Sequence, residues 1–139
     1  MELMDWSDAE QLLRLGHEIG CHTATHPMMI DLPESQLAQE IAQSLDELSR
    51  RLGAVQHFAF PFGRFETLTP AALAAARSCH VLSCASAEPG CHVAKTSDPL
   101  GLCIRRLVID PDLPLRDIRY LLARLSKRAT AADNDWPWH

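Results

Sequence analysis

The stretch of sequence that decides this fold is Gly16-His17-Glu18-Ile19-Gly20-Cys21-His22-Thr23-Ala24-Thr25-His26-Pro27. Its apolar part, residues 19–22, is predicted to form a buried strand, and the polar residues that follow mark the end of that strand. Proline disfavours the helical conformation in the residue before it, so His26 is expected in an extended or turn conformation at the rim of a sheet. The stretch therefore predicts a loop that carries two imidazoles at the end of a strand.

His22 and His26 have a spacing that allows them to share one metal ion. Two histidines four residues apart fall on one face of a helix and also on one face of an extended strand. A zinc protease helix would carry glutamate directly after the first histidine, and Thr23 stands there instead. Two interpretations remain open from the spacing alone: half of a divalent-metal site, or two ordinary surface or hydrogen-bonded histidines.

A long amphipathic helix is predicted directly after this loop. Pro33 and Glu34 suit the first turn of a helix, and Gly53 suits its end. Between them one apolar stripe, typical of packing against a sheet, is formed by Leu37, Ile41, Leu45, Leu48 and Leu52. Three further helices are predicted, over residues 7–15, 69–77 and 115–127.

Short apolar strands alternate with these helices, and this alternation predicts an α/β fold with a parallel sheet and crossover helices. The strands after the long helix are predicted at residues 57–60, 81–85 and 103–109. Functional loops of such folds gather at the carboxyl ends of the strands. The histidine loop and the tight turn Pro61-Phe62-Gly63 are therefore expected at the same edge of the sheet.

Composition narrows the classes of function. The chain has 139 residues, enough for one domain with a core, and 13 Lys and Arg stand against 18 Asp and Glu for a formal charge of -5. The acidic balance and the lack of a long basic run argue against a nucleic-acid partner. With no apolar segment long enough to cross a bilayer and no leader, the chain as given is expected to be cytoplasmic by default.

The five cysteines are an odd number without a C-x-x-C pair, so they indicate neither a zinc ribbon nor a thioredoxin-type motif. Cys21 and Cys103 lie within predicted strands and fit small buried side chains best. Cys84 and Cys91 could form a disulfide across a loop if the compartment were oxidising.

Two motifs carry a family likeness. The stretch from Gly16 to Pro27 and the later run Phe58-Ala59-Phe60-Pro61-Phe62-Gly63, at the expected separation, resemble the polysaccharide deacetylases of the NodB homology type. The resemblance covers about Met4 to Ile109. It implies metal-dependent carbohydrate esterases that remove acetyl groups from N-acetylated sugars, on a distorted barrel of parallel strands and helices.

The resemblance also implies roles for particular residues. His22 and His26 would be the two metal-binding histidines, with Zn²⁺ the expected ion. Pro61, Phe62 and Gly63 would form a wall of the substrate groove, and the backbone N–H of Phe62 would help to hold the oxyanion. Zinc lowers the pKa of its bound water and polarises a carbonyl, and a fixed N–H stabilises the negative charge that grows on the carbonyl oxygen.

The sequence departs from the family pattern at several places. An adjacent pair of aspartates, which would supply the catalytic base and the third metal ligand, occurs nowhere in the chain. Ala59 stands in place of an arginine, and Phe62 in place of a tyrosine. Near the last strand Arg105 and Arg106 occur instead of a late histidine, and they are interpreted as surface cations at a strand end.

Whether this chain is an enzyme stays open. The first hypothesis is a deacetylase-type hydrolase of amide bonds that is inactive alone because its base is missing; the alternative is a non-catalytic carbohydrate-binding or interaction module on the same fold. A full barrel usually needs 200 residues or more, so residues 1–128 are expected to form a partial domain and residues 129–139 a flexible tail. Its exposed sheet edge would favour a homo-oligomer.

Overall fold

The computed structural model describes residues 4–92, 103–129 and 135–138. Their centre is a three-stranded parallel sheet in the order β1-β2-β3, formed by His57–Ala59, Ser83–Ala85 and Cys103–Ile104. Phe58 lies opposite Cys84, and Cys84 lies opposite Cys103. The predicted α/β architecture, with parallel strands and crossover helices, is confirmed.

Cys21 extends this sheet by one residue on the free side of β1. Its N–H donates to the carbonyl of His57 at 2.7 Å, and its carbonyl accepts from the N–H of Ala59 at 2.9 Å. The histidine loop therefore begins directly after a residue that pairs with the sheet, as the sequence predicts. The neighbouring strand β1 leads into residues 61–63.

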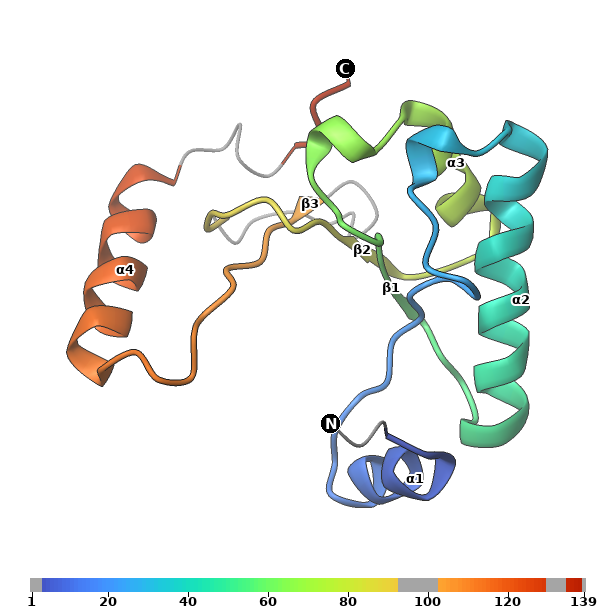
Figure 1. The fold of residues 1–139 in the computed structure, drawn as a ribbon, viewed down its shortest axis with the longest axis horizontal. Helices are drawn as coiled ribbons and strands as arrows, with labels where there is room; N and C mark the ends of the chain where they lie inside the picture. Colours follow the sequence, from blue (N-terminus) through green and yellow to red (C-terminus); the bar gives the residue numbers. More distant parts are fainter. Residues whose placement is uncertain (1–3, 93–102, 130–134, 139) are drawn as a thin grey trace.

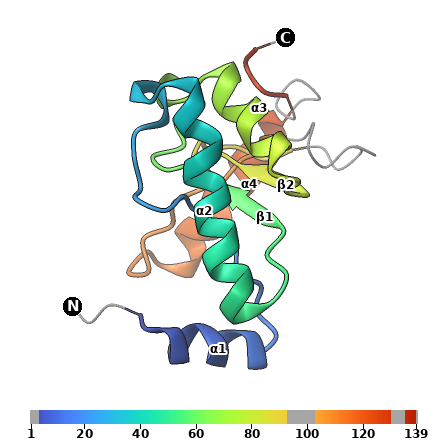
Figure 2. The same cartoon turned by 90° about the vertical axis from the view of Figure 1, so that its right-hand side faces the viewer.

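Helices α2 (Glu34–Leu52) and α3 (Pro70–Ser78) pack against each other on one side of the sheet (Figures 1 and 2). The predicted stripe of α2 is confirmed at Leu37 and Ile41, which are fully buried. Thr69 begins α3 because its hydroxyl accepts the N–H of Ala72 at 3.1 Å.

Helix α1 (Trp6–Arg14) crosses the end of α2 in Figure 2. Its N-cap is Asp5, whose carboxylate accepts the N–H groups of Ser7 and Asp8, while Asp8 accepts the N–H of Asp5 in return. This reciprocal cap begins the helix one residue earlier than the sequence predicts.

Helix α4 (Leu115–Arg128) confirms the last predicted helix, and it stands apart from the other helices in Figure 1. None of its residues is buried, and Leu115, Tyr120 and Leu122 are exposed. Five of its side chains are basic and only Asp117 is acidic, so the helix carries a formal charge of +4 (5 minus 1).

All four strands are shorter than predicted, and β1 ends at Ala59 rather than at residue 60. Of residues 19–22 only Cys21 pairs with a neighbour, and β2 begins at Ser83 rather than at residue 81. The strand predicted over residues 103–109 ends at Ile104. The chain leaves the ladder there because the N–H of Arg106 donates to the carbonyl of Glu88 at 3.1 Å, outside the sheet.

The core gathers around the sheet and the inner faces of α2 and α3. All five cysteines are free thiols, so the alternative disulfide between Cys84 and Cys91 is not formed. Burial raises the pKa of the Cys84 thiol to about 12. Cys103 is also fully buried, as expected for a small apolar side chain.

Trp136 is buried in this core with 2% of its surface exposed. Its ring lies 5.5 Å from that of Phe60 and 6.5 Å from that of Phe65, and it stacks on Trp138 at 6.3 Å. The boundary at residue 129 stays a prediction, but residues 135–138 are packed and differ from a free tail. Among the described residues, no helix combines the length and apolar character needed to cross a membrane.

Candidate functional site

His22 is the first residue after the Cys21 bridge, and its ring is oriented by β1. Its Nδ1 lies 2.7 Å from the carbonyl oxygen of Ala59. Because a carbonyl oxygen can only accept, Nδ1 must carry the proton when the ring is neutral. Nε2 then presents a lone pair, which is the state in which histidine binds a metal ion.

The rings of His22 and His26 lie side by side at the exposed edge. Their centres are 4.9 Å apart and their planes are inclined at 74°. Two imidazoles bound to one tetrahedral zinc ion would have ring centres about 5 Å apart. The structure thus brings the two predicted ligands together at a separation that suits a shared ion.

The ring of Phe62 also contacts that of His26, with ring centres 4.9 Å apart. It is the central residue of a tight turn, in which the N–H of Gly63 donates back to the carbonyl of Pro61. Its φ is 57°, and 49% of its surface is exposed. The N–H of Phe62 makes no hydrogen bond to any described residue, so it is available to an acceptor at this edge.

Gly63 is required by this turn for two reasons. Its φ is 64°, in the left-handed region that favours glycine. A Cβ at this position would lie 2.6 Å from the backbone nitrogen of Ala87, whose N–H donates to the Gly63 carbonyl at 2.8 Å. The close approach of the two backbones ties the turn to the segment that follows β2.

Backbone strain concentrates at this edge. Four described non-glycine residues have positive φ, and three of them, Thr23, His26 and Phe62, belong to the histidine loop or the turn. Such conformations cost about 1–2 kcal/mol each and persist only when other contacts enforce them. One such contact is local, because the Thr23 hydroxyl accepts the N–H of His26 at 3.1 Å.

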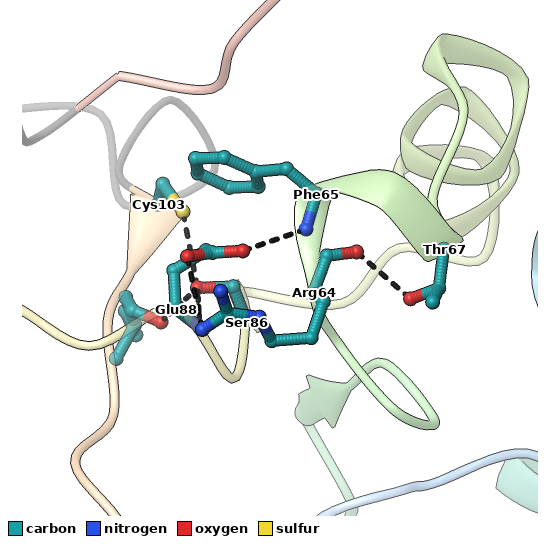
Figure 3. A network of polar contacts seen from close by, with 7 residues as sticks. Arg64, Phe65, Thr67, Ser86, Glu88 and Cys103 are labelled. Carbon is teal, nitrogen blue, oxygen red and sulfur yellow. Dashed lines mark hydrogen bonds and ion pairs between the residues drawn. The ribbon is translucent and has the colours of Figure 1, made fainter.

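A polar network joins the residues directly after the turn to the loop that follows β2 (Figure 3). The Glu88 carboxylate accepts the N–H of Phe65 at 2.8 Å and pairs with the guanidinium of Arg64 at 3.3 Å. Its side chain is only 14% exposed. The residues that follow the turn are therefore held to the loop that follows β2.

Arg105 and Arg106 follow the end of β3, as expected; Arg106 is exposed and Arg105 partly buried, and both also contact neighbouring segments. Arg106 Nε donates to the carbonyl of Ser86 at 2.7 Å, and the guanidinium of Arg105 lies 5.2 Å from the centre of the Phe65 ring. Both side chains hold the exit of β3 against the neighbouring loops, so their role here is structural.

A catalytic zinc site usually takes three protein ligands, and the described residues bring together two candidates, His22 and His26. Within residues 4–92, 103–129 and 135–138, no group of three or more His, Cys, Asp or Glu side chains is arranged to hold a metal ion. The two imidazoles fit a metal ion chemically, as neutral nitrogen ligands with one ring orientation fixed by a carbonyl. The described residues thus offer two candidate ligands, His22 and His26.

Sequence reasoning found His22, His26 and the turn, but it missed the Ala59 carbonyl. Backbone acceptors leave no residue-type signal, so only the placement of β1 beside the histidine loop reveals this contact. Thr23 belongs to the histidine motif, but the sequence does not reveal that its hydroxyl accepts the N–H of His26. That hydrogen bond depends on the left-handed conformations of Thr23 and His26.

The fold and the candidate site together are those of an α/β protein with a parallel sheet, two histidines and a tight turn at the carboxyl edge. The family model described as polysaccharide deacetylase matches residues 3–80, more than half of the chain. The chain therefore belongs to the polysaccharide deacetylase family. Comparison of the sequence with curated proteins finds no match.

Solved structures of deacetylases share the fold. The Streptococcus pyogenes deacetylase PplD in complex with acetate is similar with a TM-score of 0.72 at 18% identity, over 85% of this chain and 50% of that one. A de-N-acetylase from Aggregatibacter actinomycetemcomitans has a TM-score of 0.64 at 17% identity, over 86% and 53%. IcaB from Ammonifex degensii has a TM-score of 0.66 at 19% identity, over 91% and 54%. This chain thus spans about half the length of these structures.

Proposed function

We propose that this chain carries the histidine half of a metal-dependent deacetylase site for N-acetylated sugars. The observation that supports this most directly is the hydrogen bond from His22 Nδ1 to the Ala59 carbonyl, beside the His26 ring. It leaves Nε2 of His22 unprotonated and fixes the ring plane. Family membership supports the reaction class, removal of an acetyl group from an amide.

In this proposal His22 and His26 hold a divalent ion, with Zn²⁺ the expected one. When bound, that ion supplies a water of lowered pKa and an electrophile for the acetyl carbonyl. The backbone N–H of Phe62 donates a hydrogen bond to the oxyanion as its charge develops. Because the turn already fixes this N–H, the backbone need not reorganise during the reaction. Pro61, Phe62 and Gly63 line one wall of the sugar groove.

Without a third metal ligand and a catalytic base, this chain alone is expected to bind metal weakly and to turn over little substrate. The described residues contain no third metal ligand grouped with the histidines, and the sequence has no adjacent aspartate pair to supply a base. A catalytic zinc site normally has three protein ligands, so we expect weak metal binding and little or no turnover. A further polypeptide segment that carries the carboxylates would be needed for full activity.

The test measures metal binding before activity. The chain should bind Co²⁺ or Zn²⁺, as measured by competition with a chromogenic chelator, and His22→Ala or His26→Ala should abolish that binding. His80→Ala is the matched control, because His80 lies at the end of α3 and is not part of the histidine pair. Deacetylation of acetylated chitooligosaccharides that survives loss of both histidines would refute the proposal.

One observation favours a second function, a non-catalytic carbohydrate-binding module. The half-site offers two neutral nitrogen ligands and an exposed aromatic ring, Phe62, which can pack on a sugar face. Calorimetry separates the two functions. Binding of chitooligosaccharides that chelator does not weaken, without release of acetate, would favour the module.

We also propose that the chain associates with itself through the open edge of its sheet. Cys21 pairs only with β1 among the described segments, and helix α4 has an unburied apolar side. Unpaired strand edges and uncovered apolar faces invite a second chain. Analytical ultracentrifugation should show a dimer at micromolar concentration, and a strict monomer would contradict this proposal.

A further inference from the structure

The loop between the two histidines is held by a single side chain of α2. Glu40 Oε2 accepts the backbone N–H groups of Ala24 at 3.2 Å and Thr25 at 3.0 Å, and Glu40 Oε1 accepts the hydroxyl of Thr25 at 3.0 Å. The Glu40 backbone carbonyl accepts the Ala24 N–H as well, at 3.1 Å. All of the hydrogen bonds described for this carboxylate go to the histidine loop.

The contacts of Glu40 lie between the two residues of the loop that have a positive φ. Thr23 and His26, on either side of the clamped residues, both have positive φ, which an isolated chain of these residue types would not keep. Two N–H groups that turn inward toward one carboxylate define the path of the chain between the histidines. The clamp therefore determines how the two ends of the loop point.

The helix that carries Glu40 is packed into the core next to that residue. Its neighbour Ile41 is fully buried, and the carbonyl of Ile41 accepts the thiol of Cys21 at 3.7 Å. One turn of α2 thus contacts the chain just before His22 and just after it. A site held by a packed helix keeps its geometry better than a site held by other loops.

We propose that Glu40 is the positioning residue of the histidine pair, which fixes residues 23–25 so that the rings of His22 and His26 converge. Glu40 touches neither ring and is not itself a ligand in this arrangement. The metal-binding consequence rests on the proposed function, whereas the effect on the loop does not.

The experiment compares three variants of the full chain. Glu40→Ala removes every side-chain contact to the loop. Glu40→Gln keeps them in principle, because the amide oxygen can accept both N–H groups while the amide NH₂ donates to the Thr25 hydroxyl. Asp46→Ala is the control for loss of a carboxylate from the same helix, since Asp46 is exposed and does not contact the loop.

Two measurements are made on each variant: amide hydrogen exchange of Ala24 and Thr25 by NMR without metal, and affinity for Co²⁺ alone by chelator competition. Glu40→Ala should speed the exchange of both amides by about tenfold or more. It should weaken Co²⁺ binding by about 10–100-fold, as loss of a group that orients metal ligands does. Glu40→Gln and Asp46→Ala should stay near the unmodified chain in both measurements.

The outcomes separate this inference from the proposed function. Unchanged exchange and unchanged affinity in Glu40→Ala would overturn the role of Glu40. If the unmodified chain binds no Co²⁺, the proposed function fails, and the exchange rates alone decide the role of Glu40. If Glu40→Ala does not fold, Thr25→Val removes one contact at an exposed position, and it should speed exchange at Thr25 without lowering the melting temperature.

Discussion

Phe60 and Phe62 are two residues apart and lie in opposite environments. Phe60 is 1% exposed and packs edge-on against Phe58 and Trp136, at 4.8 and 5.5 Å between ring centres. Phe62 is half exposed, has a positive φ and faces His26. The comparison shows that one short turn separates a side that stabilises the fold from a side that holds the candidate site.

The buried side should be the more sensitive of the two, and Trp136→Ala tests it most severely. Removing this ring should lower the free energy of unfolding by about 3–5 kcal/mol, because it empties space next to Phe60 and Phe65. Its Nε1 is buried without a partner in the described structure, which favours the lower end of that range. Urea denaturation measures the change.

Trp138→Ala is the matched control for that experiment. Trp138 stacks on Trp136 but is only partly buried, so its loss should cost clearly less. Equal effects of the two substitutions would contradict the assignment of Trp136 to the core and would return residues 135–138 to the free tail that the sequence predicts.

The turn between the two sides should respond to Gly63→Ala with an intermediate loss. The positive φ costs about 1–2 kcal/mol for alanine, and the crowding against the Ala87 nitrogen adds about 1–3 kcal/mol. Gly53→Ala is the control, because Gly53 has a φ of 87° but a methyl group added there would meet no other atom within 4 Å. The difference in unfolding free energy between the two variants isolates the crowding.

The smallest change is expected in the alkylation of two buried thiols of the sheet, Cys84 and Cys103. Burial holds the pKa of Cys84 at about 12, above its ordinary value of 9, and also raises the pKa of Cys103. Both thiols should therefore remain protonated and unlabelled by iodoacetamide at pH 8 in the native chain. Because the pKa is higher in the folded state, their contribution to stability is full below pH 9 and is lost as pH rises toward 12.

Mass spectrometry after brief alkylation checks this prediction. Labelling of Cys84 at the rate of an unfolded control would show that the centre of the sheet opens readily. The buried side around Phe60 would then not be more tightly packed in solution than the exposed side around Phe62.

The sequence predicts the helices better than the strands. The apolar stripe of α2 and the helix over residues 69–77 are local signals: Leu37 and Ile41 of the stripe are fully buried, and α3 spans Pro70–Ser78. The segments 19–22 and 103–109 are apolar enough for strands, but only Cys21, Cys103 and Ile104 pair. Strand length depends on where a neighbouring backbone offers hydrogen bonds, and a single apolar run does not contain that information.

The candidate site divides in the same way. His22, His26 and the turn at residues 61–63 are visible as motifs, and the structure brings them to one edge. Glu40 is not visible, because on α2 it looks like one more solvent-facing carboxylate. Its role arises only when helix and loop are packed together.

By itself the sequence determined the alternation of strands and helices, the histidine pair and the family, because periodicity and motif spacing are properties of neighbouring residues. Tertiary structure alone decided which nitrogen of His22 stays free, which carboxylate clamps the loop and that Trp136 enters the core. Each of these depends on groups distant in the chain, and only chain packing determines which of those groups meet.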